Sequence, residues 1–147
     1  MSATSRLTNA VHALCWLELA ARRGRPRLTS AEIAASLASH PVQVRRDLAP
    51  LRRAGLVEVA GKGPGGGWSL TRPADAITLQ EVSAALGESG PFALHPHLPN
   101  QECPVGAGIA PVLDEVYAAV QSAIDRELGR RTVADVLEQT VAPAASS

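Results

Sequence analysis

The stretch from Pro41 to Leu70, PVQVRRDLAPLRRAGLVEVAGKGPGGGWSL, decides the fold of this chain. It reads as one helix, a short strand, a glycine-rich tip and a second strand. At about 100° per residue, Val44, Leu48 and Leu51 fall on one apolar face of the helix. The other face carries arginines, and such a helix is suited to a phosphate-lined groove. The stretch therefore has the outline of a winged helix-turn-helix.

The residues before this stretch supply the first helix of the helix-turn-helix. Thr29 to Glu32 is a capping-box pattern, which predicts a helix over Ser30 to Ala38. Ile33 and Leu37 are four residues apart, so both are expected to face inward. A short turn leads to a proline, which is favourable at the first position of a helix, so the recognition helix begins at Pro41. Its first residues should enter the major groove.

Two kinds of DNA contact are expected from this arrangement. Side chains at the start of the recognition helix should meet base edges, and hydroxyl or cationic side chains beside it should hold phosphates. The expected base contacts are Val42, Gln43, Arg45 and Arg46, next to Pro41. The expected phosphate contacts are Thr29, Ser30, Arg53 and Lys62, with Gly63 beside Lys62 at the wing tip.

Pro50 is the unusual residue of the recognition helix. It removes the N–H group that would donate to the Arg46 carbonyl. We expect a kink there or a break near Ala49, with the base-reading residues 41–49 helical in either case. Gly55 is expected to end the helix.

A hairpin follows, with strands at residues 56–60 and 68–70 and a tip at residues 61–67. The tip is not a phosphate-binding P-loop, because no Lys-Ser or Lys-Thr pair ends it before a helix. A plain hairpin turn is the alternative to a wing on DNA, and the neighbouring arginines favour the wing. Trp68 is expected to pack beneath the wing, since it shares a strand face with Leu70.

Helical patterns cover most of the remaining chain. Residues 4–23 predict a first helix that is apolar on two sides, so part of it is expected to meet a second subunit. Thr78 to Glu81 is a second capping box, opening a helix to about Leu86. The loop from Gly87 to Glu102 is long for a compact domain, which indicates a mobile or functional segment.

The longest predicted helix covers Ala107 to Leu128. Its apolar stripe comprises Ile109, Val112, Leu113, Val116, Val120, Ile124 and Leu128. A final short helix is expected after Thr132, followed by a loose tail over Pro143 to Ser147. The predicted fold is mainly α with a small two-stranded β wing. It divides into a winged helix-turn-helix at residues 1–87, a loop at 88–106 and a long helix with its tail at 107–147.

Charge is distributed unevenly although the formal net charge is zero. Residues 1–75 hold eleven Arg or Lys and five Asp or Glu, whereas residues 76–147 hold three and nine. This asymmetry indicates one face for an anionic partner. A hydrophobic content of 46% excludes a disordered chain, and 3% aromatics predicts an aliphatic core.

Two cysteines without a signal peptide do not make a disulfide framework, so we expect a cytoplasmic protein. Cys103 directly precedes the long helix, where the helix dipole favours a thiolate. It is therefore a candidate redox sensor, and a loop residue without function is the alternative. His95, His97 and Glu102 lie near Cys103, but their spacing does not indicate a metal site.

Several short motifs occur together in the order and spacing of one protein family. They are Arg6-Leu7-Thr8, Glu32-Ile33-Ala34, the run from Leu51 to Val57, the run from Gly65 to Leu70, and Ile77-Thr78-Leu79. In these motifs the chain resembles the bacterial Rrf2 transcriptional regulators, relatives of the IscR and NsrR type. The resemblance covers about residues 5–87 closely and the long helix loosely.

The resemblance implies a winged helix-turn-helix homodimer, held by the long helix with help from the first helix. It implies binding to a near-palindromic operator on double-stranded DNA, usually as a repressor. The best-known members hold an iron–sulfur cluster with three closely spaced cysteines before the long helix. Only Cys103 lies in that segment here, so the chain is more similar to the cluster-free branch and no cofactor is expected.

Two other classes of function are alternatives to DNA binding. A winged-helix protein–protein interaction module that does not bind DNA is the main alternative. An enzyme is not expected, because the sequence shows no paired nucleophile and base, no metal-ligand spacing and no phosphate loop.

Overall fold

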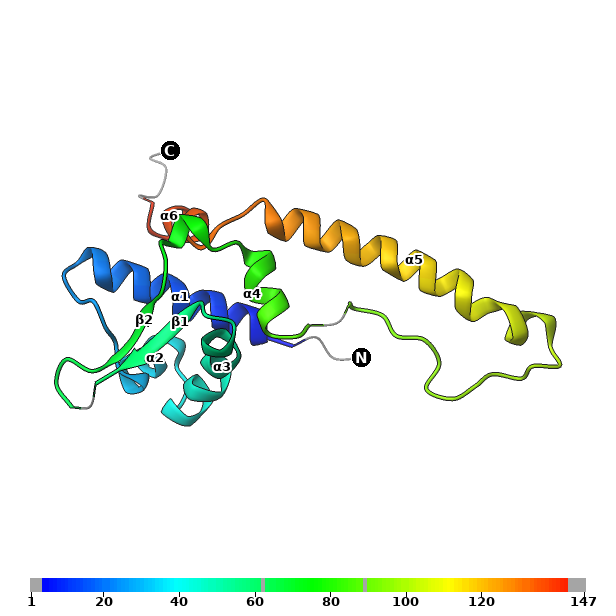
Figure 1. The fold of residues 1–147 in the computed structure, drawn as a ribbon, viewed down its shortest axis with the longest axis horizontal. Coiled ribbons are helices and arrows are strands. Elements are labelled where there is room, and N and C mark those ends of the chain that lie inside the picture. Colours follow the sequence, from blue (N-terminus) through cyan, green and yellow to red (C-terminus); the bar gives the residue numbers. More distant parts are fainter. Residues whose placement is uncertain (1–3, 62, 89, 143–147) are drawn as a thin grey trace.

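A computed structural model describes residues 4–61, 63–88 and 90–142. Figure 1 shows a body of short helices with a two-stranded wing, from which one long helix extends. In chain order the elements are α1 (Arg6–Arg22), α2 (Ser30–Leu37), α3 (Pro41–Arg53), β1 (Val57–Ala60), β2 (Gly67–Leu70), the 3₁₀ turn η1 (Ala74–Ala76), α4 (Leu79–Ala85), α5 (Pro104–Gly129) and α6 (Val133–Val141). The predicted fold class, mainly α with a two-stranded wing, is confirmed.

The core is aliphatic and lies where α1, α2, α3, α4 and α6 meet. Its largest fully buried side chains are Leu14, Leu28, Ile33, Leu48, Leu51, Ile77, Val44, Val57, Val82 and Val133. The predicted inner face of α3, with Val44, Leu48 and Leu51, is thus confirmed. Burying each of these side chains contributes about 1.5–3 kcal/mol, which fixes α3 on the body with its opposite face outward.

Capping boxes start three of the helices. In each, a threonine hydroxyl accepts from the N–H three residues on, and the acidic side chain there accepts from the threonine N–H. The pairs are Thr29 with Glu32, Thr78 with Glu81, and Thr132 with Asp135. The sequence signature of the first two boxes therefore located the starts of α2 and α4.

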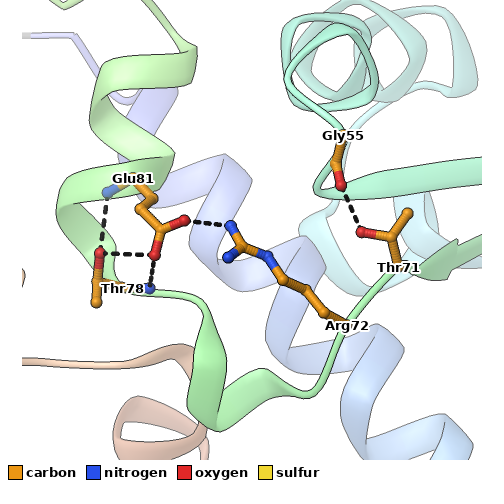
Figure 2. Close-up of polar contacts among 5 residues, drawn as sticks. All are labelled: Gly55, Thr71, Arg72, Thr78 and Glu81. Atoms are coloured by element: carbon orange, nitrogen blue, oxygen red, sulfur yellow. Dashed lines mark hydrogen bonds and ion pairs between the residues drawn. The ribbon is translucent and has the colours of Figure 1, made fainter.

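The capping residue of α4 also holds the end of the wing (Figure 2). The Arg72 guanidinium, just after β2, donates to the Glu81 carboxylate. That hydrogen bond, with those from Thr78, keeps the pKa of Glu81 below its ordinary value. One residue earlier, the Thr71 hydroxyl donates to the Gly55 carbonyl at the end of α3. The exit of the wing is therefore tied to both α3 and α4.

Helix α5 begins at Pro104, three residues before the predicted start at Ala107. Cys103 takes an extended conformation as the N-cap and the proline occupies the first helical position, where its missing N–H costs nothing. The loop before α5 runs back along it (Figure 1), and the Phe92 ring lies 5.4 Å from that of Tyr117.

No residue of α5 is buried, although the helix has an apolar stripe. The most exposed large apolar residues of α5 are Val105 at 65%, Val112 at 61% and Val116 at 49%. Val112 and Val116 belong to the predicted stripe, and Val105 lies seven residues before Val112, about two helical turns, so it is on the same side of the helix. We call these three residues the valine edge. Within the described residues, α5 therefore presents an apolar surface that nothing covers.

Helix α6 returns from the end of α5 to the body. The Leu79 N–H donates to the Arg131 carbonyl and the Val133 N–H donates to the Ile77 carbonyl, both at 2.9 Å. Val133 and Leu137 are buried against the core. The C-terminal helix thus completes the same core that carries the helix-turn-helix. Of the helices described, none is long and apolar enough to cross a membrane.

Candidate nucleic-acid interface

Helix α3 presents its cationic face to solvent. Arg45, Arg46, Arg52 and Arg53 are all exposed, and none of the ion pairs found within the described residues involves them. Val42, at the first turn, is 55% exposed. Unpaired guanidinium groups on one helix face provide bidentate donors for base edges and phosphates.

Gln43 lies beside these arginines but is tied to its own helix. Its Nε2 atom donates to Oδ1 of Asp47 at 2.9 Å, and Asp47 is only 8% exposed. The amide carbonyl of Gln43 remains available as an acceptor. If this side chain meets a base, it does so with its orientation fixed by a buried carboxylate.

The expected break near Ala49 is wrong, because α3 is continuous through Pro50 to Arg53. Proline inside a helix costs about 3 kcal/mol. Here it costs less than a break would, since the neighbouring Leu48 and Leu51 are both fully buried. Arg52 and Arg53 therefore continue the helical face that begins with Arg45.

The wing is an antiparallel pair in which Val57 faces Leu70 and Ala60 faces Gly67. Of the predicted wing contacts, Gly63 is exposed, with a φ of 71°, and its carbonyl accepts from the Gly66 N–H at 3.0 Å. Lys62, the predicted phosphate contact, lies outside the described residues. The backbone beside it forms a tight exposed turn, which can approach a DNA surface closely.

Trp68 connects the wing to α2. It is 6% exposed, as expected for a residue packed under the wing, and its indole Nε1 donates to the Ser30 hydroxyl at 3.0 Å. The Ser30 oxygen is thus occupied as an acceptor while its hydrogen can still donate. Thr29 is exposed and its oxygen is likewise engaged by the cap of α2. Both predicted phosphate donors therefore lie on the wing side of the helix-turn-helix.

A cleft of about 680 Å³ separates α3 from the wing. It is lined by Ser30, Arg45, Ala49, Arg52, Arg53, Val59 and Trp68. Three of the seven are arginines, so the cleft has a strongly positive potential. Ser30, Arg45 and Arg53 are among the DNA contacts predicted from the sequence, whereas Arg52 is not. The signal was present, because Arg52 lies seven residues after Arg45, which is close to two helical turns.

The two cysteines lie in contrasting environments. Cys103 is exposed, and the N–H groups of Gly106 and Val105 lower the pKa of its thiol. Cys15 is buried in α1, and desolvation raises its pKa to about 11. Among the described residues, no three His, Cys, Asp or Glu side chains converge as they would around a metal ion. An iron–sulfur cluster needs about four ligands, commonly thiolates, and one exposed thiol before α5 does not fit it.

Comparison with known proteins agrees with this geometry. Residues 3–139 match the Rrf2 family, described as "Iron-dependent Transcriptional regulator". The chain is 36% identical to YwnA of Bacillus subtilis (strain 168), named as an HTH-type transcriptional regulator, over 135 residues that cover 90% of this chain and 95% of YwnA. It is 39% identical over 80 residues to the HTH-type transcriptional regulator IscR of Cereibacter sphaeroides, covering 54% of this chain and 51% of that protein.

A solved structure shows the same fold. IscR of T. potens superposes with a TM-score of 0.71 at 20% identity, covering 100% of this chain and 93% of that one. The family match extends over the winged body, which carries the exposed arginines and the wing, and over α5. The chain therefore belongs to the Rrf2 family of DNA-binding transcriptional regulators.

Proposed function

We propose that this protein is a homodimeric repressor that binds a near-palindromic operator and carries no iron–sulfur cluster. The observation that carries the proposal is the pairing of an exposed cationic α3 with the uncovered valine edge of α5. The first provides a surface for DNA and the second provides a surface for a second copy. A regulator of this kind would act in the cytoplasm.

The dimer is supported by the dimensions of α5. At 1.5 Å per residue, its 26 residues extend roughly 39 Å. Two such helices packed antiparallel would place the two bodies at opposite ends. Helix-turn-helix dimers bind half-sites separated by one or more turns of DNA, in steps of about 34 Å.

Helix α1 provides a second surface of the same kind. Leu7, Val11, Trp16 and Leu19 line an open groove of about 520 Å³ between α1 and α6. The sequence predicted that α1 is apolar on two sides, and only one side is occupied by the core. The open side supports the proposal that α1 assists α5 in dimerisation.

The dimer is tested by placing a charge on α5. Val112→Glu should convert the protein to a monomer in sedimentation velocity, because a carboxylate would be buried between the helices. The matched control is Ala118→Glu, on the exposed opposite face of the same helix, which should remain dimeric. A wild-type protein that sediments as a monomer at micromolar concentration would contradict the proposal.

The operator is tested by selecting bound sequences from a random pool of double-stranded DNA, with and without reductant. We expect one near-palindromic sequence, and repression of a promoter that contains it. Recovery of no sequence by a folded, dimeric protein would favour the alternative, a winged-helix module that binds another protein. A difference between the two selections that Cys103→Ser abolishes would identify that thiol as the sensor.

A further inference from the structure

The connection between α1 and α2 is unusually basic. Its sequence from Arg22 to Thr29 is RRGRPRLT, which holds four arginines in six residues. Gly24 has a φ of 87° and turns the chain, and Pro26 restricts the backbone that follows. From sequence alone this run is only the cationic end of a helix and a stop signal. The structure places it at the wing.

A β-bridge holds the connection to the free edge of β2. The Leu28 N–H donates to the Trp68 carbonyl at 3.1 Å, and the Trp68 N–H donates to the Leu28 carbonyl at 2.7 Å. The approach is close enough that a Cβ on Gly67 would lie 2.3 Å from the Leu28 carbonyl oxygen. The connection is therefore fixed to the outer edge of the two-stranded wing by this one β-bridge.

A second cleft, of about 460 Å³, lies between this connection and the wing tip. Its lining comprises Arg25, Pro26, Arg27, Thr29, Glu32 and the wing-tip residues 63–66. Arg25 donates to the Glu32 carboxylate at 2.6 Å, so these two charges offset each other. The Thr29 N–H and Arg25 keep the pKa of Glu32 low, and it stays ionised at neutral pH.

Arg27 supplies the remaining positive charge. It takes part in none of the ion pairs found among the described residues, and its Nε atom is buried there without a hydrogen-bond partner. A guanidinium nitrogen that has lost water without gaining an acceptor is costly. Because Arg27 lines the cleft and has no ion pair within the described part of the chain, a phosphate placed there would give its guanidinium group an anionic partner, and the glycine-rich backbone opposite lets a phosphate approach.

We propose that Arg27, with the wing-tip backbone, holds a backbone phosphate of the DNA at the β2 edge of the wing. This inference rests on the proposed DNA-binding function and extends the interface beyond the cleft between α3 and the wing. DNA would then be contacted on two sides of the wing. Arg45, Arg52 and Arg53 line the cleft between α3 and the wing, and Arg27 lies at the β2 edge. The contact is to the backbone, so it adds affinity without sequence preference.

The test is the salt dependence of DNA affinity, with the selected operator and a random duplex of equal length as probes. Each phosphate contact contributes about 0.9 to the slope of log K against log salt concentration. Arg27→Ala should lower the slope by about one on both duplexes, whereas Arg27→Lys should restore it. The control is Arg126→Ala, which removes an exposed charge from α5 and should leave the slope unchanged.

Operators shortened from the outer ends locate the contact. The difference between wild type and Arg27→Ala should disappear once the flanking phosphates are removed. If Arg27→Ala keeps the wild-type slope on the full operator, this inference is wrong while the proposed function stands. If the wild-type protein binds neither duplex, the proposed function itself fails. Thermal melting of each variant separates loss of contact from loss of folding.

Discussion

The indole Nε1 of Trp68 lies 3.0 Å from the hydroxyl oxygen of Ser30, and this hydrogen bond joins the wing to the first turn of α2. The two residues are 38 positions apart in the sequence. Their hydrogen bond fixes the position of the wing relative to α2. Trp68 lines the cleft beneath the wing, and Ser30 is a predicted phosphate donor.

Trp68→Phe should lower the free energy of unfolding by about 1–3 kcal/mol, through loss of the hydrogen bond and of packing volume. Chemical denaturation of Trp68→Phe, Ser30→Ala and the double variant measures this in a double-mutant cycle. We expect a coupling free energy of about 0.5–1.5 kcal/mol. Strictly additive effects would show that the hydrogen bond contributes nothing.

Arg46→Ala should reduce the preference for operator over random DNA by about 1–3 kcal/mol, because a bidentate contact to a base edge is lost. Lys62→Ala should instead weaken binding to both duplexes alike, as expected for a phosphate contact. Fluorescence anisotropy titrations at one fixed salt concentration make the comparison. An Arg46→Ala variant with full discrimination would remove Arg46 from the base contacts.

Glu81→Gln should reduce the dependence of stability on pH. The pKa of Glu81 is lowered in the folded state, chiefly by the hydrogen bond from Arg72, so its stabilisation is present above the unfolded pKa, near 4.5, and is lost as pH falls through the lower folded value. Denaturation between pH 6 and pH 3 should therefore show a smaller loss of stability in Glu81→Gln than in wild type. Because the side chain is 35% exposed, the effect should be small.

The control for this experiment is Glu115→Gln, an exposed carboxylate on α5 that takes part in none of the ion pairs found in the described residues. It should follow the wild-type pH profile. An unchanged profile in Glu81→Gln would mean that the contact drawn in Figure 2 does not stabilise the exit of the wing.

Alkylation should distinguish the two thiols. The Cys103 thiol is exposed and its pKa is lowered, whereas the Cys15 thiol is buried and burial raises its pKa to about 11. At pH 7.5, roughly one unit below the ordinary thiol pKa, iodoacetamide should label Cys103 well before Cys15, followed by mass spectrometry of the intact protein. Equal labelling rates in the folded protein would contradict the burial of Cys15.

Local signals in the sequence were sufficient for much of the fold. The capping boxes at Thr29 and Thr78 predict the starts of α2 and α4 correctly, because each is a four-residue pattern whose side chains accept hydrogen bonds from N–H groups of the same turn. The inner face of α3 followed from the spacing of Val44, Leu48 and Leu51. The burial of Trp68 followed from strand alternation alone.

Where the structure differs from the sequence-based predictions, the cause is packing or pairing with parts of the chain that are distant in sequence. The bridge from Leu28 to Trp68 is a single residue pair, so no periodic pattern in the sequence predicts it. For the same reason the sequence does not indicate that the arginines before Leu28 lie at the wing. Local preference predicts a kink at Pro50 or a break near Ala49, and the break does not occur, because the burial of Leu48 and Leu51 keeps α3 continuous. The roles of the predicted DNA contacts remain predictions, since they depend on a partner molecule.

The return of α6 to the body sets the order in which this protein can become functional. Val133 and Leu137 fill the core between α1 and the turn at Ile77. In a nascent chain that has been synthesised only as far as α5, the apolar side chains of α1 and of this turn are therefore exposed to solvent. The helix-turn-helix, although encoded early, would reach full stability only after translation passes residue 137. A transcript truncated between α5 and α6 should accordingly yield a chain that proteases remove, and not a free-standing DNA-binding fragment.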